Sequence, residues 1–186
     1  QKMRIFQAAS ISGVYIMPKH YDLPPNEYYP TPYWCVDELL KIVDLSKVDS
    51  TGEPCRGQAR RIYDKLKEGS EWFELSEGKD YLTGKWDIAP QCIITNPPFS
   101  LAKEFLTKSL EEADVVIYLL RLAFLESGTR MEFNKANPPD HLVVLSSRPS
   151  FSEDGHTDPT AYAWFIYDKK GILELDQSFY FIPDPN

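Results

Sequence analysis

The segment Thr95-Asn96-Pro97-Pro98-Phe99 combines residue types that can hold a flat amine. The side-chain carbonyl of Asn96 and the backbone carbonyl of Pro97 can accept hydrogen bonds from the two hydrogens of one –NH2 group. Two consecutive prolines fix φ and remove two backbone donors, so the chain must turn stiffly before it enters a helix. Phe99 offers an aromatic face to a planar ring. Acceptors that draw the hydrogens of a conjugated amine out of the ring plane direct its lone pair toward an electrophilic methyl group.

We therefore take Asn96, Pro97, Pro98 and Phe99 as the candidate catalytic residues. The alternative is a rigid connection between a strand and a helix that has no catalytic role. The motif suits methylation of nitrogen rather than of carbon, for which a cysteine nucleophile would be expected.

A second segment that could bind a ligand is Glu53-Pro54-Cys55-Arg56-Gly57-Gln58-Ala59. Its glycine lets the backbone approach a ligand closely. Glu74 follows Glu53 by about 20 residues, the spacing at which nucleotide-binding sheets place a carboxylate that accepts from ribose hydroxyls. Taken alone, the loop can be explained as a simple turn, and Glu74 can be explained as a solvent-exposed side chain.

In this order, the motifs resemble those of S-adenosylmethionine-dependent DNA adenine-N6 methyltransferases of the small phage and prophage type. Asn-Pro-Pro-Phe at a strand end is similar to their catalytic motif. The loop that Glu53 opens is similar to their glycine-rich cofactor loop, although Ala59 stands where a second glycine is usual. The resemblance covers residues 28–168. It implies S-adenosylmethionine as the cofactor and the exocyclic amino group of adenine in DNA as the methyl acceptor.

Two further segments resemble parts of the cofactor site of this family. Asp80-Tyr81-Leu82 is similar to the segment that contacts the cofactor's adenine, where Asp80 would accept from the amino group and Tyr81 would stack on or flank the ring. Tyr29-Pro30-Thr31-Pro32 resembles a Thr-Pro motif at a helix start, and a helix N-terminus suits the methionine carboxylate. The alternative for this motif is an ordinary proline-capped helix. The cofactor-binding residues implied by the resemblance are Thr31, Pro32, Glu53, Pro54, Cys55, Gly57, Glu74, Asp80 and Tyr81.

The segments Arg148-Pro149-Ser150-Phe151 and Tyr162-Ala163-Trp164-Phe165 also resemble segments of this family. By that resemblance, the loop at residues 147–160 covers the pocket for the target base, and it contains Asp158 as well. Its polar residues have the alternative of being ordinary loop residues. The implied substrate-binding residues are Arg148, Ser150, Phe151 and His156.

These residues can meet only if parallel strands end at one edge of a sheet. Residues 92–95 and 115–120 are continuous apolar runs, which are typical of buried parallel strands. The segment before Glu53 is less hydrophobic than a central strand usually is, which indicates a short strand or a remodelled loop. Further strands are predicted at 72–75, 142–145, 161–167 and 179–182, with 172–175 as a hairpin partner of the last one.

Apolar residues at helical spacing predict the helices. Thr31 is predicted to be an N-cap, with Pro32 at the first helical position. A second helix is predicted after Gly57, and others over 102–110 and 128–137. Strands that alternate with helices predict an α/β fold. With the resemblance, we expect a Rossmann-like class I methyltransferase domain that has a mostly parallel seven-stranded sheet, a final antiparallel strand and helices on both faces.

The chain of 186 residues has the length of one domain. We expect residues 1–27 to be an extended N-terminal lead-in, whose first residues, Gln1-Lys2-Met3, are either added or a trimmed start. Residues 28–186 would form a single methyltransferase domain without a separate target-recognition domain. Specificity would then be modest, or would depend on a homodimer or on a specificity partner.

The charge argues against tight, non-specific DNA binding, because the net charge is −8 and the sequence pI is ≈ 4.9. We therefore expect contact with DNA to be transient. Three cysteines without a CxxC pair predict no metal site and a reducing environment. No apolar run approaches the ~20 residues of a membrane span. We expect the protein in the cytoplasm of a bacterial or phage-infected cell. The clearest basic cluster, offset by nearby acidic residues, is Arg56, Arg60, Arg61, Lys65 and Lys67.

Two alternatives remain open at this point. The first keeps methyl transfer but changes the acceptor to an RNA base or a protein glutamine, because the same turn can hold any planar amine. The second is a catalytically degenerate relative that only binds the cofactor, which Ala59, the polar first strand and the acidic charge would explain.

Overall fold

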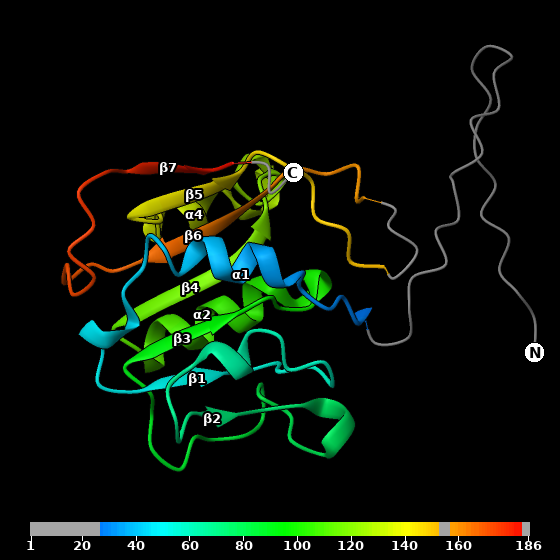
Figure 1. The fold of residues 1–186 in the computed structure, drawn as a ribbon, viewed down its shortest axis with the longest axis vertical. Coiled ribbons are helices and arrows are strands. Elements are labelled where there is room, and N and C mark those ends of the chain that lie inside the picture. Colours follow the sequence, from blue (N-terminus) through cyan, green and yellow to red (C-terminus); the bar gives the residue numbers. More distant parts are fainter. Residues whose placement is uncertain (1–26, 153–156, 184–186) are drawn as a thin grey trace, which may run out of the picture.

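The computed structural model describes residues 27–152 and 157–183, and its strands form one seven-stranded sheet in the order β2-β1-β3-β4-β6-β5-β7 (Figure 1). Most of the predicted lead-in and His156 lie outside the described residues. The strands are β1 (Thr51–Glu53), β2 (Glu71–Trp72), β3 (Cys92–Thr95), β4 (Val115–Arg121), β5 (His141–Leu145), β6 (Tyr162–Tyr167) and β7 (Phe179–Ile182). The α-helices are α1 (Tyr33–Leu39), α2 (Ala102–Glu112), α3 (Ala123–Glu126) and α4 (Met131–Ala136). Short 3-10 helices lie at Leu45–Lys47, Tyr63–Lys65, Leu75–Glu77, Phe99–Leu101 and Gly128–Arg130.

The strand directions confirm the mostly parallel sheet. β2, β1, β3 and β4 pair in parallel, with Cys92 opposite Val115 and Thr95 opposite Tyr118. β6 lies between β4 and β5 and runs antiparallel to both, whereas β7 pairs in parallel with β5. The antiparallel strand is therefore the penultimate one in the sequence and not the last. A parallel neighbour would need a crossover connection, usually a helix, between β5 and β6. No helix lies between them among the described residues, which agrees with their antiparallel pairing.

Helices cover both faces of the sheet, as predicted. On one face α1 packs through Leu39, and the indole N–H of Trp164 in β6 donates to the Cys35 carbonyl at 3.1 Å. On the other face α2 packs through Phe105 and Leu106. β3, β4 and β6 are buried almost throughout, which explains why their sequences are continuous apolar runs. Within the described ranges, no helix has both the length and the apolar character that crossing a membrane requires.

β1 is only three residues long, which accounts for the weak hydrophobicity before Glu53. Thr51 and Glu53 are both buried, and Thr51 Oγ1 lies 2.5 Å from Ser70 Oγ in a buried hydrogen bond. Trp86 packs so closely on Gly52 that a Cβ atom there would lie 3.0 Å from the indole ring. Side-chain hydrogen bonds and close packing therefore take the place of apolar side chains in this strand.

The helix predicted after Gly57 does not form, and that prediction is wrong. This stretch consists of turns and the 3-10 helix Tyr63–Lys65. Gly57 (φ 64°) and Arg60 (φ 53°) have left-handed backbones, through which a right-handed helix cannot continue. Ile62 is nevertheless only 3% exposed. The apolar pattern thus predicts burial correctly but predicts the wrong backbone.

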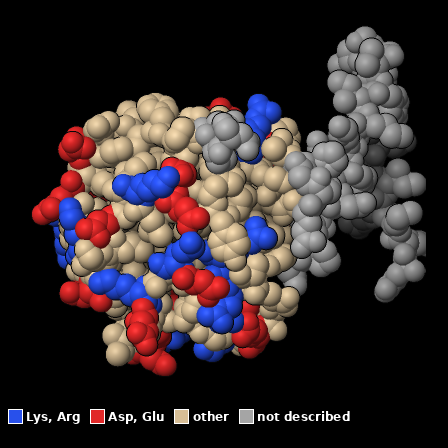
Figure 2. Space-filling view, in the orientation of Figure 1, with Lys and Arg blue, Asp and Glu red and all other residues tan. Residues whose placement is uncertain are grey.

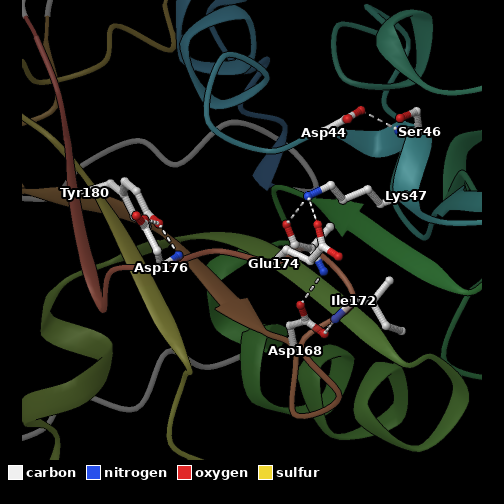
Figure 3. A network of polar contacts seen from close by, with 9 residues as sticks. Asp44, Ser46, Lys47, Asp168, Ile172, Glu174, Asp176 and Tyr180 are labelled. Carbon is white, nitrogen blue, oxygen red and sulfur yellow. Dashed lines mark hydrogen bonds and ion pairs between the residues drawn. The ribbon is translucent and has the colours of Figure 1, made fainter.

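The predicted hairpin partner of β7 at 172–175 does not form either. The Asp168 carboxylate accepts the backbone N–H of Ile172 at 2.9 Å and that of the next residue at 2.7 Å, groups that a strand would use for pairing. Glu174 has a left-handed backbone with φ 54°. Its carboxylate accepts from Lys47 Nζ at 2.7 Å, which ties the loop to the segment after α1 (Figure 3). Side chains, and not a strand, therefore hold this loop in place.

Candidate cofactor and amine site

A cavity of about 650 Å³ lies beyond the carboxyl ends of β1, β2 and β3, where open α/β sheets bind their ligands. Its volume is in the range of sites that bind small molecules. The walls come from residues 27–31, the loop after β1 with Pro54 and Cys55, the loop after β2, and Asn96 and Pro98 of the turn after β3. The structure thus brings most of the predicted cofactor-binding residues next to the candidate catalytic turn.

Asn96, the first residue after β3, has a side-chain amide held on one side only. Its Nδ2 donates to the Tyr29 backbone carbonyl at 3.0 Å and to Thr31 Oγ1 at 3.1 Å. Its Oδ1 is buried and has no hydrogen-bond partner in the described part of the chain. Because a buried acceptor is normally paired, this oxygen fits a donor that comes from a bound molecule.

Glu53 at the end of β1 supplies a second buried acceptor. Its side chain is 2% exposed, and its Oε2 lacks a partner among the residues that the structure describes. Burial raises the pKa of Glu53 well above its ordinary value, although the Arg56 guanidinium and the Tyr63 backbone N–H oppose this shift. A carboxyl group in such a place is costly unless a ligand supplies a donor. Glu53 therefore fits a cationic or hydrogen-bond-donating group in the cavity.

The loop after β1 bends at Gly57, whose φ is 64°. The Gly57 N–H donates to Glu74 Oε2 at 2.8 Å and so joins this loop to the end of β2. The Tyr28 hydroxyl accepts from the Ala59 N–H at 2.9 Å, and its ring would lie 3.0 Å from a Cβ atom at Gly57. A residue with a side chain at position 57 would thus be strained and would displace Tyr28.

Glu74, after the end of β2, also lines the cavity. Its Oε1 accepts from the backbone N–H and the hydroxyl of Ser76, at 3.0 and 2.5 Å. Its Oε2 accepts only from Gly57 among the described residues. Since a carboxylate oxygen can accept two hydrogen bonds, Oε2 keeps one site for a hydroxyl donor.

Asp80 also lies on the cavity wall. Its two carboxylate oxygens accept from the Leu82 N–H at 3.0 Å and from the Thr83 hydroxyl at 3.1 Å. Asp80 therefore caps the turn that follows it, and each oxygen keeps one site for a further donor.

Tyr81 lines the cavity next to Asp80, and most of its side chain is buried. The side chain is 1% exposed and packs against Phe73 and Phe105, with ring centroids 5.4 and 5.2 Å apart. Its hydroxyl lies 2.9 Å from Ser109 Oγ and donates to Glu112 at 2.8 Å. Because its ring packs in the core, Tyr81 fixes the part of the cavity wall that it forms.

The Thr-Pro motif is placed differently from the predicted helix cap. α1 begins at Tyr33 with Pro32 as its cap residue, one position later than predicted. The Thr31 hydroxyl accepts from Asn96 instead of capping the helix. Pro32 is buried and does not line the cavity, whereas Thr31 does.

Phe99 lies in an aromatic cluster beside the cavity. Its ring centroid is 5.3 Å from that of Tyr29, 5.7 Å from that of Tyr162 and 6.3 Å from that of Phe151. The Arg121 guanidinium lies over the Phe99 ring, 4.5 Å from its centroid. Arg121 therefore lies beside the candidate site, although no motif in the sequence points to it. The available signal is that it ends the otherwise apolar β4, at the same sheet edge as the candidate catalytic turn.

Arg121 is held on the aromatic cluster by hydrogen bonds and charge. Its Nε donates to the Tyr162 hydroxyl at 3.1 Å, and its Nη2 lies 3.5 Å from the Asp158 carboxylate. Burial alone would raise the pKa of Asp158, but hydrogen bonds from Thr160 and Tyr162 and the charge of Arg121 lower it below its ordinary value. Asp158 is thus an anion that keeps this cation in place.

The predicted substrate-binding residues differ in their burial and contacts. Phe151 is buried in the aromatic cluster, with its ring centroid 5.2 Å from that of Tyr162. The Ser150 hydroxyl donates to the Ser152 carbonyl at 3.0 Å, within the same loop. Arg148 is exposed.

Three of the five basic residues between positions 56 and 67 form ion pairs with acidic ones. In the lower part of the face seen in Figure 2, where β1 and β2 lie, Lys and Arg side chains are intermixed with Asp and Glu. Such a surface offers little net attraction to a phosphate backbone. The ion pairs are Arg56–Glu77, Arg60–Asp64 (3.0 Å) and Lys65–Asp37 (2.6 Å).

Comparison with known proteins gives structural neighbours only. A Listeria monocytogenes protein assigned to the class I S-adenosylmethionine-dependent methyltransferases superposes with a TM-score of 0.53 at 13% identity, over 88% of this chain and 67% of that one. A Pyrococcus horikoshii protein assigned as an RNA methyltransferase superposes with a TM-score of 0.58 at 14% identity, over 81% of this chain and 93% of that one. No protein-family model and no curated protein matches the sequence. This likeness shows that the chain has the Rossmann-like fold of class I methyltransferases.

Proposed function

We propose that this chain is an S-adenosylmethionine-dependent methyltransferase that methylates the exocyclic amino group of adenine in DNA. The observation that carries the proposal is the buried, unpartnered Oδ1 of Asn96 beside the cavity at the carboxyl edge of the sheet. A conjugated amine needs an acceptor in such a place, because its lone pair must turn out of the ring plane before it can attack a methyl group.

The cavity residues fit the proposed cofactor. S-adenosylmethionine, when bound, supplies a methyl group that the positive sulfonium activates. Glu53 Oε2 would accept from the methionine ammonium, and Glu74 Oε2 would accept from a ribose hydroxyl. Asp80 would accept from the adenine amino group. The loop that contains Pro54, Cys55 and Gly57 lines the cavity and would border the methionine part. This chemistry needs no metal ion.

The target base would bind at the aromatic cluster beside Asn96. Asn96 Oδ1 and the Pro97 carbonyl would accept the two hydrogens of the target amine. Phe99 would stack on the base, which contributes about 1–3 kcal/mol in comparable contacts. Because the adenine amino group is paired in a duplex, the base would have to leave the helix. Arg148, Ser150, Phe151 and His156 would contact the target nucleotide from the covering loop.

An RNA base is the second candidate acceptor, and the likeness to the Pyrococcus horikoshii protein assigned as an RNA methyltransferase favours it. A protein glutamine would offer the same planar amine. A catalytically degenerate relative is the remaining alternative. It is favoured by the hydrogen bond from the Ala59 backbone N–H to the Tyr28 hydroxyl, because this donor in the candidate cofactor loop is already used within the protein. Sequence specificity toward a nucleic acid would be modest, or would depend on a homodimer or on a specificity partner.

Transfer of labelled methyl groups from S-adenosylmethionine to unmethylated DNA, RNA and bulk protein tests the proposal. We expect label in DNA, and a loss of about 100-fold or more with Asn96→Ala, comparable to the removal of one key group in other active sites. Asn134→Ala is the matched control, because Asn134 also donates through Nδ2 to a backbone carbonyl, at 3.0 Å, but does not line the cavity. Label in RNA alone would favour the second acceptor. Cofactor binding without transfer to any acceptor would favour the degenerate relative.

A further inference from the structure

The amide of Asn96 is clamped from a distant part of the chain. Its Nδ2 donates to the Tyr29 carbonyl at 3.0 Å and to Thr31 Oγ1 at 3.1 Å, across a sequence separation of 67 and 65 residues. Thr31 is 4% exposed, so water does not compete for its hydroxyl. Both hydrogens of the Asn96 amide therefore have protein acceptors, while Oδ1 has no partner in the described ranges.

The two ends of an asparagine amide carry opposite hydrogen-bonding groups. If the amide of Asn96 were turned by 180°, its Oδ1 would face the Tyr29 carbonyl oxygen, and two acceptors would oppose each other. The amide nitrogen would then point toward the substrate and could not accept from an amine. The Tyr29 carbonyl thus selects the orientation, because it can only accept. The Thr31 hydroxyl adds a second bond that holds the plane of the amide.

The two acceptors of the Asn96 amide, the Tyr29 carbonyl and the Thr31 hydroxyl, form a clamp that is anchored beside the turn after β3. The Glu27 carboxylate accepts from the backbone N–H of Ser100 at 3.0 Å and from its hydroxyl at 2.8 Å. The Tyr29 ring packs on Phe99, with ring centroids 5.3 Å apart. Residues 27–31 and the turn after β3 are therefore bound to each other at several points, and the acceptors of the Asn96 amide cannot move independently of that turn.

We propose that Thr31 is a positioning residue for methyl transfer, which together with the Tyr29 carbonyl fixes the Asn96 amide with Oδ1 toward the target amine. This inference rests on the proposed function of Asn96. It assigns the Thr-Pro motif to the amine side of the reaction and not to the methionine carboxylate of the cofactor.

The test compares Thr31→Val, which has nearly the same shape but lacks the hydroxyl, with Thr31→Ser, which keeps it. We expect the Val variant to lose about tenfold in kcat, since small errors in the placement of a reacting group are costly. Its Kd for S-adenosylmethionine, measured by calorimetry, should stay within about twofold of the wild-type value, because only the transition state needs the clamp. The Ser variant should recover most of the lost kcat.

NMR can measure the hydrogen-exchange rates of the Asn96 side-chain amide, which report on its two hydrogen bonds without any enzyme turnover. Both Nδ2 hydrogens should exchange slowly in the wild type and the Ser variant, and one of them faster in the Val variant. If the wild type transfers no methyl to any acceptor, the proposed function fails, and this exchange alone decides whether the clamp exists.

A Val variant with wild-type kcat and unchanged amide exchange would overturn the inference. So would a raised Kd for S-adenosylmethionine with an unchanged kcat, which would assign Thr31 to the cofactor. If the Val variant does not fold, Thr31→Ser and Thr31→Ala are compared in the same way, because they differ only in the hydroxyl.

Discussion

The Cys55 thiol joins the loop after β1 to the end of β3, with its Sγ 2.9 Å from Thr95 Oγ1 and 3.3 Å from the Asn96 carbonyl oxygen. β1 and β3 are neighbours in the sheet. The loop proposed to border the cofactor and the turn that carries Asn96 are therefore in direct contact. A displacement of one would be transmitted to the other through this thiol.

The three thiols should be unreactive in the folded protein. Burial raises the pKa of Cys35 and Cys55 far above the ordinary value and that of Cys92 to about 12. Because the thiolate is the species that reacts, we expect little alkylation by iodoacetamide at about pH 8, and full alkylation after unfolding in urea. Mass spectrometry after timed exposure measures this. Labelling of Cys55 in the folded protein as fast as in urea would contradict the observed contacts.

Replacement of Glu53 by glutamine should separate stability from cofactor binding. A carboxyl group whose pKa is raised on folding contributes stability below its unfolded pKa, and this contribution is lost as the pH rises through the folded pKa. Glu53→Gln removes that loss, so the unliganded variant should melt higher than the wild type at about pH 8, and its advantage should vanish near pH 4. Thermal unfolding at several pH values checks both statements.

The same variant should bind S-adenosylmethionine at least about tenfold more weakly, because a charge-assisted hydrogen bond to the ammonium is lost. Calorimetry at about pH 8 measures the Kd for S-adenosylmethionine of both proteins. A variant that is less stable at that pH and binds the cofactor normally would contradict the assignment of Glu53 to the ammonium.

Tyr81→Phe should affect folding far more than cofactor binding. The substitution removes a hydroxyl that bonds with Ser109 and Glu112 and leaves these groups with fewer partners, at a cost of about 1–2 kcal/mol in the free energy of unfolding. The Kd for S-adenosylmethionine should change less than about twofold, since the ring lies in the core. Urea denaturation and calorimetry test this pair of expectations. An equally stable variant with weak cofactor binding would place the hydroxyl at the cofactor instead.

Phe99→Leu should weaken the binding of the nucleic acid and leave the cofactor alone. Loss of a base–aromatic stack costs about 1–3 kcal/mol, so we expect the KM for DNA to rise by roughly tenfold. Phe133→Leu is the control, because Phe133 lies on α4 and packs on Phe124, with ring centroids 6.4 Å apart, outside the cavity. Equal effects of the two substitutions on the KM for DNA would argue against stacking by Phe99.

The position of Asn96 could be predicted from the sequence because two physical rules act together. The apolar run at 92–95 determines where β3 ends, and parallel strands end at the same sheet edge. Glu53 and Glu74 are predicted instead from the glycine-containing loop and from the spacing of about 20 residues between the two carboxylates, and both line the cavity. In the described part of the chain, Glu53 Oε2 and Asn96 Oδ1 are buried acceptors without a hydrogen-bond partner, which is consistent with ligand binding by Glu53 and Asn96.

The directions of other side chains depend on partners far along the chain, which spacing cannot reveal. Tyr81 turns into the core because Ser109 and Glu112 are there to receive its hydroxyl. Thr31 turns to Asn96 and not to the helix that follows it. The missing helix after Gly57 has a local cause, the left-handed backbone of Arg60, a conformation that is uncommon for residues other than glycine.

Nucleoside mass spectrometry of DNA tests the central claim most directly. The protein is expressed in a host that lacks adenine methylation, beside Asn96→Ala and the control Asn134→Ala. We predict N6-methyladenine in DNA with the wild type and with Asn134→Ala, and none above background with Asn96→Ala. An equal amount of N6-methyladenine with Asn96→Ala would contradict the assigned role of Asn96. Unmethylated DNA in all three cultures, with every protein folded and able to bind S-adenosylmethionine, would contradict the assignment of DNA adenine as the acceptor.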